Sequence, residues 1–299
     1  MSNSKYINMK AISALMQSKP SIAIRAIYSP EELSLTKSGK TRRLFSNQSH
    51  KFDMKNGKKI ITKGMYLAPS DEAGYGINTC KNATKICRGV CLKYTGKLAL
   101  PVNAEPRILK TRYFYAYPIQ FLNQLIDEMK KAAISAEKKG ETIQFRLNGT
   151  SDINWEKYLH MDRLIEDIPA LTKFYDYTKN PSRSVNPDHY HLTFSISDRK
   201  SSITTGLEYL EKGQSVAVVT SKTEKAAVME SGLFVDGDLS DHRPQDPKGS
   251  IVLLAFKGKG ATKHQRGTDD GFIKSAASIL KLAAQKTGIL HARTEVKTR

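Results

Sequence analysis

From about residue 59 onward, strand-like and helix-like segments alternate, and this alternation limits the possible folds more than any other feature. Short apolar runs rich in β-branched and aromatic residues are each followed by a stretch with helical spacing of apolar residues. This order predicts parallel βαβ units. Six strands are clear, at residues 59–67, 142–148, 172–178, 191–197, 215–221 and 251–256.

A seventh strand is expected within residues 233–238, and the helical segments complete the pattern. Helices are expected at residues 107–140, 155–168, 202–213, 222–232 and 270–288. The sequence therefore predicts an α/β protein with a parallel β/α barrel, full or partial and TIM-like, of six to seven strands. We prefer this barrel to a doubly wound sheet. No GxGxxG motif follows the first strand, so a Rossmann dinucleotide site is not expected.

The first 55 residues differ from the rest of the chain. The segment TKSGKTRRLFSNQSHKFDMKNGKK, at 36–59, carries many positive charges and shows no clear apolar period. We predict a basic, irregular N-terminal arm over residues 1–55, followed by a single barrel domain over residues 56–299.

The balance of charges points to a polyanionic partner. The chain has 48 Lys and Arg against 29 Asp and Glu, a formal net charge of +19. Such an excess is typical of proteins that bind nucleic acid, although a solvated lysine-rich face is the alternative. Residues expected to contact phosphates are Arg42, Arg43, Arg107, Lys110, Arg112, Lys257 and Lys259.

The location of the protein is predicted from what its sequence lacks. We find no apolar run of signal-peptide or membrane-spanning length. An odd number of cysteines without an export signal argues for a reducing compartment. We therefore expect a cytoplasmic protein without a membrane partner.

All three cysteines lie in one loop, INTCKNATKICRGVCLKYTG, at residues 77–96. Cys80, Cys87 and Cys91 are separated by six and three residues, and such clustered thiols can share one metal centre. Three thiolates suit a four-iron cluster (4Fe-4S) with one iron left open. Zinc is the alternative metal and would need a fourth ligand, such as His50, His242 or His264. Redox chemistry and three reduced structural thiols are the other possibilities.

Polar residues gather where the expected strands end, which is where β/α barrels carry their chemistry. Asn148, Thr150, Ser151 and Asp152 follow the second strand, and helix capping is the alternative role for them. The candidate catalytic residues are Asp152, Lys179, Asp198 and Asp238. The three acids Asp236, Asp238 and Asp241 also allow a divalent-metal nuclease.

A three-cysteine loop after the first strand of a β/α barrel resembles the radical S-adenosylmethionine enzymes. The resemblance implies that Cys80, Cys87 and Cys91 ligate a four-iron cluster whose open iron binds S-adenosylmethionine. It also implies that Asn148, Thr150, Ser151 and Asp152 hold this cofactor. The spacing here differs from the three and two intervening residues usual in that superfamily.

The chain more specifically resembles a phage family named after gene product 88. The shared segments lie within residues 65–200 and read LAPSDEAGYGINTCKNATKICRGVCLKYTG, RILKTRYFY, RLNGTSDINWE, FYDYTKNP and YHLTFSISD. The resemblance implies a phage or mobile-element origin and supplies no reaction.

Two hypotheses for the function follow from these observations. The leading one is a phage-encoded, radical S-adenosylmethionine-like iron–sulfur enzyme that acts on nucleic acid or nucleotides in the host cytoplasm. The alternative is a non-catalytic, metal-stabilised nucleic-acid-binding protein of phage replication or host takeover.

Overall fold

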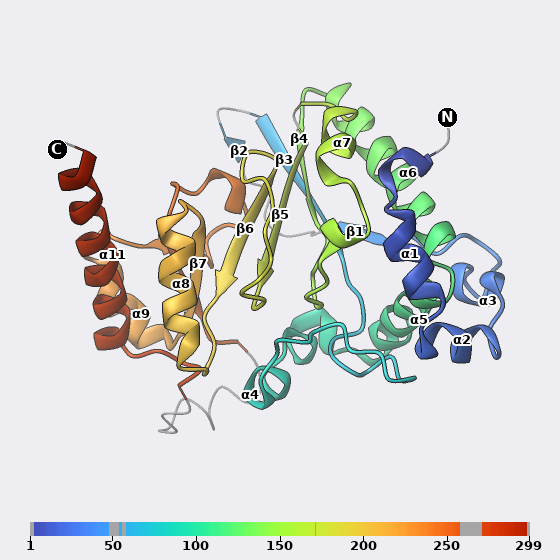
Figure 1. The fold of residues 1–299 in the computed structure, drawn as a ribbon, viewed down its shortest axis with the longest axis horizontal. Coiled ribbons are helices and arrows are strands. Elements are labelled where there is room, and N and C mark those ends of the chain that lie inside the picture. The colour runs from blue at the N-terminus through green and yellow to red at the C-terminus, as the bar shows by residue number, and fades with distance from the viewer. Residues whose placement is uncertain (1–2, 48–53, 56–57, 171, 258–270, 298–299) are drawn as a thin grey trace. The chain divides into compact units, whose positions relative to one another are not determined.

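Figure 1 shows the computed structural model, which describes residues 3–47, 54–55, 58–170, 172–257 and 271–297. The chain forms two compact units. The first unit contains residues 1–81, 97–176 and 184–190, and the second contains residues 82–96, 177–183 and 191–299. Strands in each unit are mostly parallel and are accompanied by helices, which confirms the predicted α/β class. The single domain expected over residues 56–299 stays a prediction.

The sheet of the first unit is built around its longest strand, β3. Its strands are β1 (Phe45–Asn47), β2 (Met54–Lys55), β3 (Lys58–Met65), β4 (Thr142–Arg146) and β5 (Thr172–Thr178). β3, β4 and β5 are parallel, whereas β1 and β2 pair antiparallel with β3. Phe145 lies opposite Phe174, and its ring is 5.1 Å from that of Phe45 and 5.5 Å from that of Phe174. One face of this sheet is therefore an aromatic core.

The long helix expected over residues 107–140 is two helices, α5 (Ala104–Ala116) and α6 (Pro118–Glu137). Pro118 explains the break, because proline disfavours the helical conformation in the residue before it. Tyr117 accordingly has φ −130° and ψ 61°. The helix expected over residues 155–168 is also shorter, with a 3-10 turn, η5 (Trp155–Lys157), before α7 (Met161–Glu166).

The N-terminal segment is not irregular, so this part of the prediction is wrong. After the 3-10 turn η1 (Asn3–Tyr6) it forms the helices α1 (Met9–Met16), α2 (Lys19–Arg25) and α3 (Pro30–Ser34). Their apolar residues Ile12, Ile24 and Leu33 are fully buried, and α2 and α3 pack against α5. Each helix is too short to show a sustained apolar period, which is why the sequence pattern missed them.

The sheet of the second unit is entirely parallel. Its strands are β6 (Tyr190–Ser195), β7 (Ser215–Thr220), β8 (Val235–Asp236) and β9 (Ile251–Ala255). β7 pairs with β6 and β9, and β8 pairs with β9. The seventh strand expected within residues 233–238 is confirmed as β8. The pairings inside the two units neither confirm nor exclude a closed barrel, which stays a prediction.

The helices of the second unit are α4 (Lys85–Gly89), α8 (Ser201–Glu211), α9 (Lys222–Met229) and α11 (Ala276–Lys297). α11 packs against α8 and α9, which contact β7 and β9 respectively (Figure 1). Further 3-10 turns are η2 (Leu92–Tyr94), η3 (Gly96–Ala99), η4 (Pro101–Asn103) and η6 (Arg243–Gln245). None of the helices in the described part of the chain is long and apolar enough to cross a bilayer.

Candidate functional site

Asn148 organises the polar run that follows β4. Its Oδ1 accepts hydrogen bonds from Ser151 Oγ at 2.8 Å, from the Ile153 N–H at 2.9 Å and from Trp155 Nε1 at 3.3 Å. Its Nδ2 donates to the Ile153 carbonyl at 3.0 Å and to Asp176 Oδ2 at 2.7 Å. The side chain is buried and has used its hydrogen-bonding capacity inside the protein.

Asp176, on β5, is the hydrogen-bond acceptor at the centre of this arrangement and was not among the predicted site residues. It is fully buried, and it accepts hydrogen bonds from the Asn148 N–H at 2.8 Å, from Asn148 Nδ2 and from the Tyr190 hydroxyl. A carboxylate needs such donors to remain charged away from water. The sequence signal was an acid in the middle of the buried strand FYDY.

Cys80 lies beside the same polar run. Its Sγ is 3.7 Å from the Thr150 carbonyl, and the Asp152 N–H donates to the Thr79 carbonyl at 2.9 Å. The hydroxyl of Thr150 donates to the Leu67 carbonyl, which ties the run after β4 to the chain after β3. The carboxyl ends of β3 and β4 therefore bring the first cysteine next to Thr150 and Asp152.

Gly149 is required by this close approach. A Cβ at residue 149 would lie 2.6 Å from Tyr66 Cδ1 and 2.8 Å from the Met65 carbonyl oxygen. Of the four residues expected to hold a cofactor, Asn148, Thr150 and Ser151 use their side-chain oxygens to bind the protein itself. Their role in holding S-adenosylmethionine stays a prediction.

The other two cysteines follow Thr84, in the second unit. The Thr84 hydroxyl accepts from the Cys87 N–H at 3.0 Å and donates to Asp198 Oδ1 at 2.6 Å. Asp198, a predicted catalytic residue, thus anchors the start of α4, which carries Cys87. None of the three cysteines forms a disulfide in the described part of the chain, and all three are partly exposed.

The shared centre expected for the three thiols stays a prediction. Cys80 belongs to the first unit, whereas Cys87 and Cys91 belong to the second. Among the residues with described positions, no group of three or more His, Cys, Asp or Glu side chains is arranged to hold a metal ion.

Lys179, a candidate catalytic residue, directly follows β5, as the sequence predicted, and belongs to the second unit. Its Nζ donates to Ser195 Oγ at 2.8 Å and to the Ser195 carbonyl at 3.2 Å, and lies 5.2 Å from the ring centroid of Phe272. These contacts hold the ammonium group against β6.

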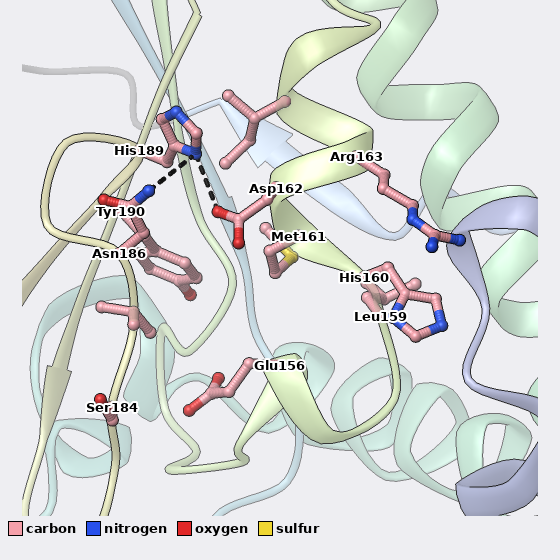
Figure 2. Close-up of a pocket in the computed structure, with 12 residues that line it drawn as sticks. Glu156, Leu159, His160, Met161, Asp162, Arg163, Ser184, Asn186, His189 and Tyr190 are labelled. Carbon is pink, nitrogen blue, oxygen red and sulfur yellow. Dashed lines mark hydrogen bonds and ion pairs between the residues drawn. The ribbon is translucent and has the colours of Figure 1, made fainter.

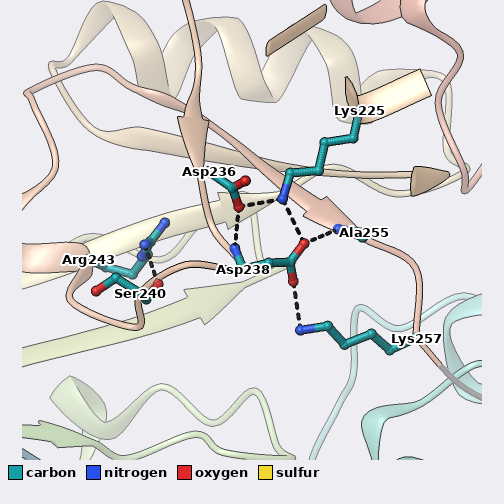
Figure 3. A network of polar contacts seen from close by, with 7 residues as sticks. All are labelled: Lys225, Asp236, Asp238, Ser240, Arg243, Ala255 and Lys257. Carbon is teal, nitrogen blue, oxygen red and sulfur yellow. Dashed lines mark hydrogen bonds and ion pairs between the residues drawn. The ribbon is translucent and has the colours of Figure 1, made fainter. Parts of the chain in front are cut away.

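Asp238, the last candidate catalytic residue, belongs to an ionic network with two lysines (Figure 3). Its Oδ2 accepts from Lys225 at 2.8 Å and from the Ala255 N–H at 2.7 Å, and its Oδ1 pairs with Lys257 at 2.6 Å. Burial alone would raise the pKa of Asp238, but the hydrogen bonds from both lysines and from Ala255 lower it to about 2. Lys225 also pairs with Asp236. Both carboxylates therefore have lysine partners, an arrangement that does not favour the divalent-metal nuclease.

Several residues expected to contact phosphates are engaged within the first unit. Arg107 and Lys110 are buried and donate to the carbonyls of Leu98 at 3.0 Å and Leu44 at 3.2 Å. Burial lowers the pKa of Lys110 to about 8. These two residues therefore form no solvated face.

The remaining basic residues differ in exposure. Arg42 donates to the Leu35 carbonyl at 2.7 Å, and Arg112 donates to the Ala73 carbonyl at 3.0 Å. Arg43 and Lys257 are exposed. Lys259 lies outside the described residues. A contact between any of them and nucleic acid stays a prediction.

The first unit also has a pocket of about 530 Å³ that the sequence did not reveal (Figure 2). It lies between α7 and the residues before β6, and His189 Nδ1 is 2.8 Å from Asp162 Oδ1 at its wall. Tyr190 lines the pocket and donates its hydroxyl to Asp176. The pocket is thereby linked to the hydrogen bonds of Asn148.

The fold and these sites define an α/β protein in which parallel strands carry polar, hydrogen-bonded runs at their carboxyl ends, with a cysteine beside one of them. The family described as Gene product 88 matches residues 33–275, and the chain belongs to this phage family. This match confirms the closer resemblance noted in the sequence, whereas the relationship to radical S-adenosylmethionine enzymes stays a prediction. No match was found among curated proteins or solved structures.

Proposed function

We propose that this phage protein is an iron–sulfur enzyme, similar to radical S-adenosylmethionine enzymes, with Cys80, Cys87 and Cys91 as cluster ligands. The observation that supports it is the 3.7 Å separation between Cys80 Sγ and the Thr150 carbonyl. It puts the first thiol at the carboxyl ends of β3 and β4, the edge where parallel-strand enzymes carry their chemistry.

The donor set fits this group chemically. Three partly exposed cysteines outside any described disulfide would supply the thiolates that iron–sulfur clusters prefer, and they would leave one iron for a further ligand. Zinc is the alternative metal. Asp152 is partly exposed, whereas Asn148 and Ser151 are buried, so we propose Asp152 as the residue that orients a bound cofactor.

Metal analysis of anaerobically purified protein tests the proposal. We expect iron and sulfide in amounts that indicate one cluster, and loss of that iron in Cys80→Ala, Cys87→Ala and Cys91→Ala. A matched control is Thr95→Ala, which removes a hydroxyl from the same loop. The proposal is lost if the three cysteine variants retain the iron and zinc content of the unmodified protein.

A spectroscopic experiment separates an enzyme from a protein with a structural cluster. Adding S-adenosylmethionine should perturb the spectrum of the reduced cluster, because the open iron would bind it. Asp152→Ala should weaken this perturbation and leave the iron content unchanged. An unchanged spectrum at millimolar cofactor would end the enzyme proposal while leaving a metal site in place.

The net charge of +19 favours a second candidate, a non-catalytic nucleic-acid-binding protein of phage replication or host takeover, acting in the host cytoplasm. Binding to DNA or RNA should weaken steeply with salt, because each phosphate contact releases counterions. Arg43→Ala and Lys257→Ala should each reduce the salt slope by about 1. Binding that does not depend on salt, or its absence at low ionic strength, would reject this candidate.

A further inference from the structure

Four polar side chains of the second unit, three buried and one partly exposed, hold buried polar atoms that meet no partner among the described residues. Thr193 and Ser215 are fully buried, and neither hydroxyl has a hydrogen-bond partner there. Arg243 is 1% exposed and its Nε is unpartnered, as is Nε2 of His191. Buried polar groups are nearly always hydrogen-bonded, so four such atoms together call for an explanation. We refer to these four residues as the His191–Arg243 cluster.

The four side chains belong to one region of the second unit. Thr193 on β6 lies opposite Ser215 on β7 in the register of the parallel pair. His191 is two residues before Thr193 and so lies on the same face of the strand. Arg243, from η6, is close enough to His191 for its charge to lower the pKa of that imidazole. The cluster therefore gathers along β6 and at the amino-terminal end of β7.

The orientation of Arg243 is determined by its other contacts. One terminal nitrogen pairs with Asp246 at 3.1 Å, and the other donates to the Ser240 carbonyl. The Nε–H, and the terminal nitrogen that pairs with Asp246, have no hydrogen-bond partner among the described residues. The guanidinium group has donors and no acceptor, and hydroxyl groups can also donate. The unpartnered atoms therefore include possible donors to an anion, namely the Arg243 guanidinium and the hydroxyls of Thr193 and Ser215.

We propose that the His191–Arg243 cluster binds a phosphate-sized oxyanion, either free phosphate or the phosphoryl group of a larger ligand. Such an anion offers several acceptor oxygens to the hydroxyls of Thr193 and Ser215 and to the Arg243 Nε–H. A metal cation does not fit, because the Arg243 guanidinium is cationic and the Asp246 carboxylate is already paired with it. Partly exposed His191 is the side of the cluster open to solvent.

Proton uptake should accompany binding. Burial and the charge of Arg243 lower the pKa of His191 to about 4, and burial, opposed by Arg243, raises the pKa of Asp246 to about 6. A bound anion would favour the proton on both groups, so affinity should rise as the pH falls from 7.5 to 6. Asp241 and the buried His242, which precede η6, are the other titratable groups of this segment, and β7 contributes none.

Calorimetric titration of the full-length protein with inorganic phosphate and with adenosine monophosphate tests the proposal. Thr193→Val and Ser215→Ala remove one hydroxyl each and nearly preserve shape, and each should weaken binding about tenfold. Ser250→Ala is the matched control, because its buried hydroxyl already donates to the Pro247 carbonyl. Repeating the titration at pH 6 and 7.5 measures the proton linkage.

The two ligands distinguish the sources of the anion. Tighter binding of the nucleotide assigns the cluster to a phosphoryl group, and equal or tighter binding of inorganic phosphate assigns it to the free anion. Equal affinity in Thr193→Val, Ser215→Ala and the unmodified protein would attribute binding to surface charge and overturn the proposal. So would the absence of binding in the unmodified protein at 10 mM of either ligand, with buried water then the partner of these groups.

Discussion

Two polar clusters of the second unit differ in how their buried charges and hydroxyls are satisfied. At β8 and β9, Lys225 bridges Asp236 and Asp238, and Lys257 completes the pairing. Thr193, within β6, and Ser215, at the start of β7, have hydroxyls without protein partners in the described structure. A fully paired network stabilises a fold, whereas a partly paired one marks the place where a ligand or water supplies the missing bonds.

The polar run after β4 resembles the paired cluster. Asn148 makes five hydrogen bonds through its side chain, and Asp176 is held by Asn148 and Tyr190. Polar residues at strand ends therefore have two different roles in this protein. Substitutions distinguish these roles. Removing a paired group leaves its partner without a hydrogen bond, whereas removing an unpartnered hydroxyl leaves no other group unsatisfied.

Asn148→Ala should have the largest effect. It removes five hydrogen bonds and leaves the buried Asp176 carboxylate with fewer donors, so we expect a loss of about 4 kcal/mol in the free energy of unfolding. Urea denaturation measures it. Asn123→Ala, at a partly exposed asparagine of α6, is the control. Equal losses in the two variants would contradict the structural role of Asn148.

His191→Gln should change the pH dependence of stability. The folded pKa of His191, about 4, lies below its ordinary value of 6.5, so its neutral form stabilises the fold above pH 6.5. This contribution is lost as the pH falls from 6.5 toward 4, because the unfolded chain binds the proton more readily. The shift corresponds to roughly 3 kcal/mol, and the glutamine variant should not lose it.

Asp246 opposes this effect over the same range. Its pKa, raised to about 6, means that its protonation favours the folded state as the pH falls below 6. Because it lacks the His191 imidazole, His191→Gln should be more stable than the unmodified protein at pH 4.5. Urea midpoints at pH 4.5 and 7 measure this. His160→Gln, at an exposed histidine, is the control. Identical pH profiles in all three proteins would show that His191 is not buried in a cationic surrounding.

Lys225→Met should destabilise the protein by about 2 kcal/mol, because it leaves Asp236 and Asp238 without their shared partner. The loss is smaller than for a fully buried pair, since the two aspartates are 22% and 20% exposed. Lys222→Met, at an exposed position of α9, should leave the thermal midpoint nearly unchanged. A similar midpoint for both variants would refute the importance of the network.

Thr193→Val and Ser215→Ala should have the smallest effect, and of the opposite sign. Each replaces a buried hydroxyl without a protein partner by an apolar group, so unfolding should cost the same or up to about 1 kcal/mol more. Thermal denaturation in phosphate-free buffer measures this. A loss of more than about 1 kcal/mol in the free energy of unfolding would indicate protein hydrogen bonds to these hydroxyls and remove the contrast between the clusters.

Local pattern predicted much of the fold. The strand TKFYDYT was predicted with the bounds that β5 has, because its aromatic and β-branched residues favour a pleated, buried strand. Pro118 in the sequence indicates the helix break at Tyr117, but a single helix was predicted there. The three N-terminal helices were missed because each is shorter than the window in which helical periodicity is visible. Their capping residues, such as Ser18 and Ser29, were the remaining sequence signal.

The candidate sites were predicted less well than the strands. Asp152 and Cys80 were both predicted. In the structure the Asp152 N–H donates to the Thr79 carbonyl, and Cys80 Sγ lies beside the Thr150 carbonyl. Asp176 and Arg243 were not chosen as candidate site residues, and His191, Thr193 and Ser215 were not named. A reading of YHLTFS at period two would have revealed His191, Thr193 and Ser195 on one face of a buried strand.

By itself, the sequence determined the α/β class, the positions of the parallel strands and membership of the phage family, because periodicity and motif are properties of neighbouring residues. Only the tertiary structure decided which polar side chains form hydrogen bonds within the protein. Asn148 and Asp176 are 28 residues apart, and Thr84 and Asp198 are 114 apart. Hydrogen bonds are short and directional, so partners this distant along the chain meet only once the strands have packed.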